Sequence, residues 1–199
     1  MKLVCLDLEG VLLPEFWQEF SKETNIPELM KTTRDEPDYN KLMNMRIELL
    51  EKNGYGLAEI KNVVNKMNPL EGAPEFINWL KQRAQIVILT GAFYDYITPL
   101  MEKLGYPCMF ANTLEIDENG KIIGYKLREA DGKIEMINRF HDSGMQTIAI
   151  GDSFNDLKML KGAGKGIIFR GCDALKKQEP TLSCAENYNE LKLILENIL

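Results

Sequence analysis

The 199-residue sequence predicts an α/β fold in which a doubly wound, Rossmann-like parallel sheet carries a small inserted helical cap and a β-hairpin. Two observations predict the sheet. Short apolar runs, typical of strands buried on both faces, alternate with amphipathic helical stretches, and polar residues follow several of these runs. One observation predicts the cap: three helical stretches come in succession before the second apolar run, whereas a simple crossover between parallel strands needs one helix.

The first strand is expected over residues 3–6, an unbroken apolar run that leads into Asp7, Glu9 and Gly10. Open α/β sheets bind ligands beyond the carboxyl ends of their strands, so an acidic site is expected at this point. A pair of carboxylates at a strand end is also common as a solvated turn. This stretch alone leaves both interpretations open.

Residues 14–68 contain three expected helical stretches and no convincing strand. The first is expected over 14–23. The second covers 39–52, with Asp38 in a suitable position to cap its N-terminus. The third, 57–67, has an apolar stripe along one face. Three consecutive helices favour a cap inserted over the strand ends; the alternative is one α/β domain with an irregular first crossover.

The catalytic core is therefore expected from residues 1–13 and 69–199, with 14–68 as the cap. After residue 68, strand and helix signals alternate, which favours right-handed βαβ units. Asn119 and Gly120, between two apolar stretches, predict a hairpin turn. The expected strands are 85–89, 108–110, 114–116, 121–123, 147–150 and 166–169, and the expected helices are 74–83, 93–104, 132–143, 157–161 and 188–199.

Composition narrows the function classes. A net charge of −6 argues against nucleic acid or an anionic membrane as the main partner, and no apolar stretch approaches membrane-spanning length. The four cysteines form no C-x-x-C pair, so reduced thiols of a cytoplasmic protein are expected. The N-terminal residues are expected to run directly into the first strand, so no signal peptide is expected. His141 is the single histidine, which weakens Ser-His-Asp and multi-histidine metal hypotheses.

Three expected strands deliver polar residues at their carboxyl ends: Asp7 with Glu9, then Thr90 with Gly91, then the stretch 151–156. Lys133 lies at the start of an expected helix between the last two. Thr90-Gly91 alone would be an ordinary turn, and Lys133 alone an ordinary surface lysine. Their order along the chain, each near the end of a strand or the start of a helix, favours a common site.

Each of these residue types has a chemical use. Asp7, Asp152 and Asp156 together make an oxygen-rich site that suits magnesium. A carboxylate can also attack phosphorus and form an acyl phosphate. A lysine supplies a positive charge to phosphate oxygens, which Thr90 and the Gly91 N–H can also bind. Glu9 can protonate a leaving oxygen and later deprotonate an acceptor.

These residues, taken together, resemble the motifs of a known family. Asp7-x-Glu9-Gly10-Val11, Thr90, Lys133 and the stretch Gly151 to Asp156 resemble the four motifs of the haloacid dehalogenase-like hydrolases. The helical insertion resembles the cap of the phosphoserine phosphatase branch. The chain is also similar to the members of that branch that are both phosphoserine phosphatase and phosphoserine:homoserine phosphotransferase, through stretches such as 32–35 and 69–73.

The resemblance implies a magnesium-dependent reaction in which Asp7 attacks phosphorus and Glu9 acts as general acid and base. It also implies a magnesium ion held by the Asp7 carboxylate, the Glu9 backbone carbonyl and Asp152, with Asp156 nearby. The phosphate would be held by Thr90, Lys133 and Asn155. One departure matters: most relatives have Asp where this chain has Glu9, and the extra methylene moves the acid by roughly 1 Å. The bifunctional members share this Glu.

The cap offers candidates for the rest of the substrate. Arg46 falls within an apolar stripe, four residues after Leu42 and three before Leu49, so its charge either extends to solvent or faces the site. The resemblance implies that Arg46 binds the substrate carboxylate and that Glu15 lies near the substrate amine. Arg34 is a weaker candidate. The aromatic cluster of Phe16, Trp17 and Phe20 is expected to pack the cap and not to contact substrate.

These observations predict hydrolysis of O-phosphoserine, with possible phosphoryl transfer to homoserine. A homodimer is expected from the family alone. Two alternatives stay open. One is a phosphatase for another small phosphomonoester. The other is a phospho-acceptor regulatory domain, against which the helical insertion and the general acid Glu9 both argue.

Overall fold

The computed structural model describes residues 1–33, 35–36, 38–129 and 132–199, and its centre is one mixed β-sheet. Within these residues the strand order is β4-β3-β2-β1-β5-β6-β7. Every neighbouring pair is parallel except β3 and β4, which form the expected antiparallel hairpin. The strands are β1 (Lys2–Leu6), β2 (Gln85–Phe93), β3 (Cys108–Ile116), β4 (Ile122–Lys126), β5 (Gln146–Gly151), β6 (Lys165–Phe169) and β7 (Ser183–Ala185).

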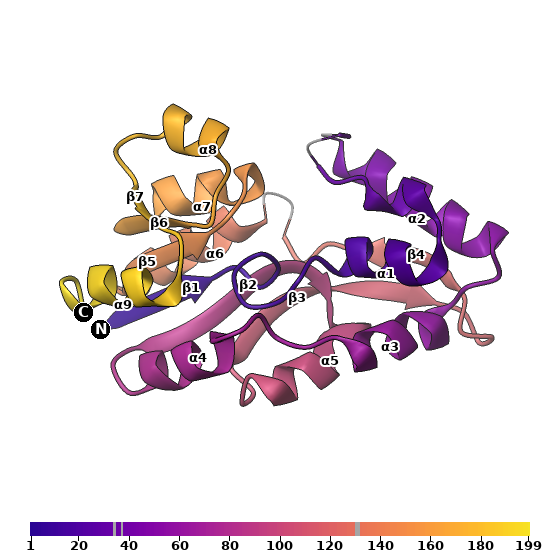
Figure 1. The fold of residues 1–199 in the computed structure, drawn as a ribbon, viewed down its shortest axis with the longest axis horizontal. Helices are drawn as coiled ribbons and strands as arrows, with labels where there is room; N and C mark the ends of the chain where they lie inside the picture. The colour runs from indigo at the N-terminus through magenta and orange to yellow at the C-terminus, as the bar shows by residue number, and fades with distance from the viewer. Residues whose placement is uncertain (34, 37, 130–131) are drawn as a thin grey trace.

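Helices cover both faces of this sheet (Figure 1), which makes the fold doubly wound. Helices α4, α5 and α9 lie on one face, and α6, α7 and α8 lie on the other. This arrangement confirms the expected fold class. The helices are α1 (Phe16–Thr24), the 3-10 helix η1 (Pro27–Met30), α2 (Tyr39–Lys52), α3 (Leu57–Lys66), α4 (Ala73–Lys81), α5 (Tyr94–Lys103), α6 (Lys133–Asp142), the 3-10 helix η2 (Phe154–Asp156), α7 (Leu157–Gly162), α8 (Asp173–Gln178) and α9 (Tyr188–Glu196).

Strand β1 lies at the centre of the sheet, and its side chains alternate between the two cores. Val4 and Leu6 pack into the core beneath α4, α5 and α9, whereas Leu3 and Cys5 pack into the core beneath α6, α7 and α8. This double burial explains why the strand is an unbroken apolar run. Leu6 pairs with Ile88 of β2 on one side and with Ile150 of β5 on the other, so the residues that follow these three positions meet at one edge of the sheet.

Between β1 and α4 the described residues form α1, η1, α2 and α3 and none of the seven sheet strands, as expected. Figure 1 shows α1 and α2 beyond the arrowhead of β1. Asp38 caps α2, because its side chain accepts hydrogen bonds from the Asn40 and Lys41 N–H groups. We propose that residues 14–68 form a cap over a core of 1–13 and 69–199. None of the helices in the described part of the chain has the length and apolar character needed to cross a membrane.

The β3–β4 hairpin supports these helices. The Tyr125 hydroxyl on β4 donates to Asn40 Oδ1 over 2.5 Å, and the Leu57 N–H at the start of α3 donates to the Gly120 carbonyl over 3.0 Å. A Cβ atom on Gly56 would lie 2.6 Å from that same carbonyl, so only glycine allows this approach. The hairpin therefore does more than extend the sheet, because it also fixes α2 and α3.

Several expected boundaries were wrong. Strand β2 does not stop before Thr90 but continues to Phe93, with a register shift between Leu89 and Phe93. The expected strands 108–110 and 114–116 are one strand, β3. The sequence also gave no signal for η1, α8 or β7, because elements of three to six residues have too few positions to establish a periodic pattern.

Candidate active site

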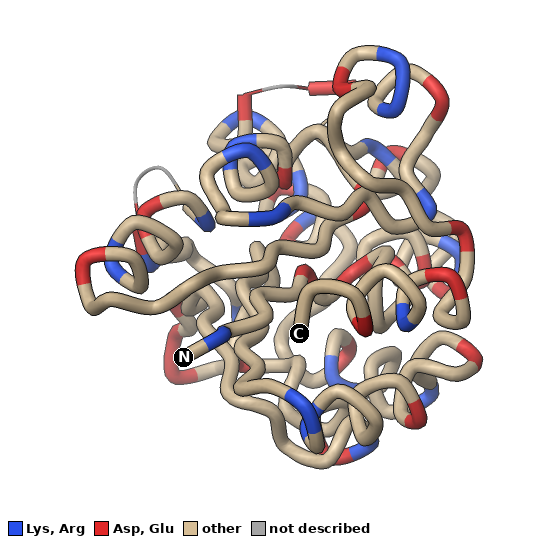
Figure 2. The backbone as a smooth tube through the Cα atoms, turned by 90° about the vertical axis from the view of Figure 1, so that its left-hand side faces the viewer, with Lys and Arg blue, Asp and Glu red and all other residues tan. Residues whose placement is uncertain are grey.

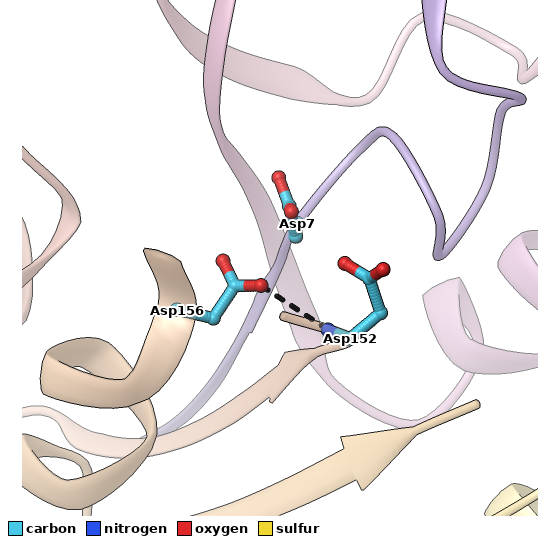
Figure 3. Close-up of side chains that lie close together, drawn as sticks. All are labelled: Asp7, Asp152 and Asp156. Atoms are coloured by element: carbon cyan, nitrogen blue, oxygen red, sulfur yellow. Dashed lines mark hydrogen bonds between the residues drawn. The ribbon is translucent and has the colours of Figure 1, made fainter. Parts of the chain in front are cut away.

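Three carboxylates from two separate parts of the chain converge at the carboxyl ends of β1 and β5 (Figure 3). Asp7 follows β1, Asp152 follows β5, and Asp156 ends η2; an oxygen atom from each lies within 4.8 Å of the others. Gly10 makes this convergence possible. Its φ is +78°, and a Cβ atom there would lie 2.4 Å from the Asp152 carboxylate carbon.

Lys133, the first residue of α6, bridges two of these carboxylates. Its Nζ lies 2.6 Å from Asp7 Oδ1 and 2.6 Å from Asp156 Oδ1, and its side chain is only 9% exposed. Burial alone would lower the lysine pKa, but the two carboxylates outweigh burial and raise the pKa above its ordinary value. Lys133 is therefore a fixed positive charge at the centre of the site.

Asp156 is completely buried, and it organises the loop after β5. Its Oδ2 accepts hydrogen bonds from the Asp152 N–H, the Ser153 N–H and the Ser153 hydroxyl, at 3.0 to 3.1 Å. With Oδ1 on Lys133, both carboxylate oxygens have partners. Asp156 thus orients Asp152 as well as adding its own charge to the site.

Asp7 lies in an environment that disfavours its charge. Burial, followed by the negative charge of Asp156, raises the pKa of the Asp7 carboxyl well above its usual range, and Lys133 opposes this only in part. Three carboxylates at this separation match the oxygen ligands that Mg²⁺ prefers, and a divalent cation would compensate their repulsion. The donor set therefore fits magnesium.

The Glu9 side chain is fixed at the start of α1. Its Oε1 accepts a hydrogen bond from the Phe16 N–H over 2.8 Å. Burial, and then the nearby charge of Glu15, raise the pKa of Glu9 to about 7. A carboxyl group with that pKa can give and take a proton near neutral pH.

Thr90 and Gly91 lie in the irregular part of β2. The Thr90 hydroxyl oxygen accepts a hydrogen bond from the Ala92 N–H over 3.0 Å, so its own hydrogen is available to another acceptor. The Gly91 carbonyl accepts from Asn112 Nδ2 over 3.0 Å and from the Tyr39 hydroxyl over 3.4 Å. These bonds hold the backbone of this segment in place, and one of them comes from Tyr39 of α2.

Most of the predicted site residues line one cavity of about 250 Å³. Thr90 instead lines an adjoining cavity of about 430 Å³, which shares Gly91, Lys133 and Asn155 with the first. Asp156 is completely buried, in hydrogen-bond contact with Lys133. The predicted residues on the first cavity are Asp7, Glu9, Glu15, Arg46, Gly91, Lys133, Asp152 and Asn155. Arg34, the weaker candidate, lies outside the described residues.

Arg46 faces the site and does not extend to solvent. It is 6% exposed and lines the cavity, and burial lowers the pKa of its guanidinium. The apolar stripe around it is only partly as expected, because Leu42 is buried but Leu49 is only partly buried. Glu15, at the N-cap position of α1, lines the same cavity.

Four contributors were missed by the sequence analysis: Trp17, Tyr39, Tyr96 and Asn112. The first three line the cavity, and Asn112 holds Gly91. Tyr39 directly follows the predicted N-cap of α2, but nothing in the local pattern distinguishes it from a packing residue. The same is true of Tyr96, which stacks on Phe16 with ring centroids 4.5 Å apart.

Positively charged side chains are spread along this acidic chain, and two of them line the cavity. Figure 2 shows Lys and Arg interspersed with Asp and Glu along the backbone. Within the cavity, Lys133 and Arg46 are the cations among its described lining residues. An anionic ligand would therefore be attracted by these two side chains and by a bound cation, and not by the net charge of −6.

Comparisons with known proteins agree with this geometry. A family model described as haloacid dehalogenase-like hydrolase matches residues 1–164. The chain is 42% identical to the phosphoserine phosphatase ThrH of Pseudomonas aeruginosa over 192 residues, covering 96% of this chain and 94% of that protein. It is 30% identical to a phosphoserine phosphatase of Methanocaldococcus jannaschii, covering 99% of this chain and 97% of that protein.

Solved structures give the same picture. The fold matches a phospho-aspartyl intermediate analogue of phosphoserine phosphatase with a TM-score of 0.79 and 25% identity, covering 98% of both chains. It matches a substrate-bound phosphoserine phosphatase complex with a TM-score of 0.79 and 26% identity, covering 98% of this chain and 97% of the other.

Proposed function

The chain belongs to the haloacid dehalogenase-like hydrolase family, and on that premise we propose that it hydrolyses O-phosphoserine to serine and phosphate. The observation that carries the proposal is that an aspartate, a lysine and a buried arginine line one cavity. Asp7 and Lys133 form one end of this set, and Arg46 comes from the cap. The similarity to phosphoserine phosphatases along nearly the whole chain supports this substrate.

In the proposed first step, a carboxylate oxygen of Asp7 attacks phosphorus. A bond forms between this oxygen and phosphorus while the bond from phosphorus to the serine oxygen breaks, which leaves an aspartyl phosphate. The backbone supports this geometry, since the Leu8 N–H donates to Asp7 Oδ1 over 2.7 Å and fixes the orientation of the side chain. A related phosphoserine phosphatase was solved as a phospho-aspartyl intermediate analogue.

Glu9 is the proposed proton carrier. In its neutral form it gives a proton to the departing serine oxygen. In its charged form it takes a proton from the water that attacks phosphorus in the aspartyl phosphate, while the bond from phosphorus to the Asp7 oxygen breaks and phosphate leaves. A pKa of about 7 suits both roles near neutral pH. The hydrogen bond from the Phe16 N–H holds the group in place while it changes charge.

Magnesium is the proposed cofactor, with ligands from Asp7, Asp152 and the Glu9 backbone carbonyl, and with Asp156 close by. When bound, it would neutralise phosphate charge and favour the ionised form of Asp7. The hydrogen bonds of Asp156 to the loop and to Lys133 suggest that it acts mainly by orienting Asp152 and Lys133.

The remaining groups hold the substrate. Lys133 supplies charge to the phosphate oxygens, together with donors from Thr90, Gly91 and Asn155. In the cap, Arg46 would bind the carboxylate of phosphoserine, and Glu15 would lie near its ammonium group. This division explains why both the core and residues from 14–68 line the cavity.

The same aspartyl phosphate can be attacked by an alcohol in place of water. We propose homoserine as such an acceptor, which would yield phosphohomoserine and free Asp7. Homoserine would enter the cavity of about 250 Å³ after serine has left it, because Asp7 and Glu9 both line that cavity. The similarity to ThrH and the presence of Glu9 are what favour transfer.

The test is to incubate the purified protein with O-phosphoserine and Mg²⁺, with and without homoserine, and to measure phosphate, serine and phosphohomoserine. We expect phosphate release that stops in the Asp7→Asn variant and is suppressed by a chelator. Absence of both phosphate and phosphohomoserine would contradict the proposal, and a panel of other phosphomonoesters would then identify the substrate. A long-lived phospho-Asp7 form without turnover would indicate a regulatory domain instead.

A further inference from the structure

The guanidinium of Arg46 lies over the ring of Trp17. The distance from the guanidinium carbon to the ring centroid is 4.6 Å, which is within the range of a cation–π interaction. The two residues are 6% and 7% exposed, and both line the candidate active-site cavity. Because Trp17 belongs to α1 and Arg46 to α2, the contact joins two helices at the wall of the cavity.

The ring of Trp17 is itself held by other aromatic side chains. Phe16 and Phe20 contact it edge-on, with centroid distances of 5.1 Å and 6.2 Å. Phe16 is stacked in turn on Tyr96. The indole therefore has little freedom to turn, and it presents a fixed face to Arg46.

The hydrogen bonds of Arg46 leave part of the guanidinium without a partner. Its Nη2 donates to the Lys31 carbonyl over 2.9 Å, and its Nη1 contacts Met43 Sδ at 3.6 Å, a weak acceptor. Nε is buried and has no hydrogen-bond partner among the described residues. A buried N–H without a partner is costly, so this donor is suited to a ligand that brings an acceptor.

We propose that Trp17 is a positioning residue for Arg46 and thereby sets the preference of the site for phosphomonoesters that carry a carboxylate. This inference rests on the proposed function. The Trp17 ring fixes the plane of the guanidinium, and the Lys31 carbonyl fixes one donor within that plane. The remaining N–H groups then meet a planar carboxylate without first having to be ordered, which strengthens binding.

Phosphoserine and phosphoethanolamine provide a matched pair of substrates, because phosphoethanolamine has the phosphate and the amine but no carboxylate. We expect Trp17→Leu to raise KM for phosphoserine about tenfold and to change kcat less than about twofold. The KM for phosphoethanolamine should stay the same. Trp17→Phe keeps an aromatic face and should restore most of the affinity for phosphoserine.

The Arg46→Ala variant shows whether Trp17 acts through Arg46. In Arg46→Ala, adding Trp17→Leu should cause no further change in KM for phosphoserine, because the residue that Trp17 positions is already absent. An equal effect of Trp17→Leu in both backgrounds, or on both substrates, would overturn the inference and make Trp17 a direct packing surface for substrate.

Fluorescence gives a measurement that does not depend on turnover. The chain has two tryptophans, and Trp79 packs on α4 against Phe76, so Trp79→Phe leaves Trp17 as the only reporter. Its emission should shift on titration with phosphoserine and not with phosphoethanolamine. No shift with phosphoserine, in protein whose thermal unfolding is normal, would overturn the inference. A different result would contradict the proposed function, namely that the unsubstituted protein does not hydrolyse phosphoserine.

Discussion

A small number of contacts determines the position and the charge of each side chain in the candidate site. Asp7, Asp156 and Lys133 form one hydrogen-bonded unit, so a change in any of them alters the charge that the other two experience. Glu9 stands apart from this unit, at the start of α1, where burial and Glu15 raise its pKa to about 7. The two acids after β1 therefore have different surroundings, which agrees with different proposed roles.

Two substrates with different leaving groups can distinguish the role of Glu9 as proton donor from a role in structure. Glu9→Gln should lower kcat/KM for phosphoserine by about 10² to 10⁴, because an alkoxide leaves poorly without a proton. With 4-nitrophenyl phosphate, whose leaving group needs no proton, the loss in kcat/KM should be under about tenfold. Equal losses on the two substrates would show that Glu9 does not act as the general acid.

A substitution at Gly10 would strain the backbone and would also place a Cβ atom against Asp152. A second glycine, Gly144, allows these two effects to be measured separately. Gly10 and Gly144 both have positive φ, +78° and +76°, but a Cβ atom on Gly144 would meet nothing within 4 Å. Both alanine variants should lose about 1 to 2 kcal/mol of stability from the left-handed backbone. Only Gly10→Ala should lose more, together with activity, because its Cβ displaces Asp152. Equal unfolding free energies and normal activity in both would contradict this.

At the scale of whole elements, the site depends on how the cap helices are held. Helix α2 carries Tyr39 and Arg46, and it is fixed at its N-terminus by Asp38 and along its side by the hairpin through Tyr125 and Asn40. The Tyr39 hydroxyl reaches the Gly91 carbonyl, which links this helix directly to β2. A change that loosens α2 should therefore affect substrate binding more than chemistry.

The N-cap of α2 tests this dependence. Asp38→Ala should destabilise the protein by about 1 kcal/mol and raise KM for phosphoserine several-fold, because Arg46 loses its fixed position. Asn187→Ala is the control, since Asn187 caps α9 in the same way, away from the lining residues of the cavity. It should cost similar stability and leave KM unchanged. A rise in KM in both variants would mean that general destabilisation is the cause.

For the molecule as a whole, the arrangement of strands brings the acidic residues together. β1 is central, with β2 and β5 in register on either side, and the helices on both faces keep all three strands buried. Because the fold holds these three carboxylates together, their repulsion lowers the free energy of unfolding of the whole protein. Ligands that reduce this repulsion should increase global stability.

Magnesium should therefore stabilise the protein as well as activate it. At a Mg²⁺ concentration about 100 times its Kd, the expected gain is about 2.7 kcal/mol. For a chain of this length, each 1 kcal/mol raises the unfolding midpoint by roughly 2–4 °C. Calorimetry with and without a chelator measures the shift, and Asp152→Asn should reduce it strongly. A midpoint that Mg²⁺ does not change would contradict a magnesium site.

The core itself should respond to alkaline pH through Cys5. Burial raises the pKa of this thiol from 9.0 to about 12. Above pH 9 the thiol ionises in the unfolded chain but not in the folded one, so stability falls as pH rises toward 12, by at most about 1.4 kcal/mol per pH unit. Denaturant unfolding at pH 8 and pH 10 should show a smaller fall for Cys5→Ala than for the unsubstituted protein. Cys108→Ala, at an exposed position, should show the full fall.

The sequence by itself determined the fold class, the order of most elements and the positions of the acidic residues. Buried parallel strands are continuous apolar runs, and such runs are visible locally. Polar residues directly after them must meet at one edge of the sheet. For this reason the sequence predicts Asp7, Thr90 and Asp152 as parts of one site.

Only the tertiary structure decided which further residues complete that site. Trp17 against Arg46, Tyr39 and Asn112 on Gly91, and Gly10 beneath Asp152 are pairs separated by many positions in the chain. No periodicity specifies such pairs, because they form where two elements pack, and packing depends on the shape of every side chain between them. The strand-end acids follow from a repeating backbone pattern, whereas the orientation of the arginine in the cavity follows from contacts that exist only in the folded protein.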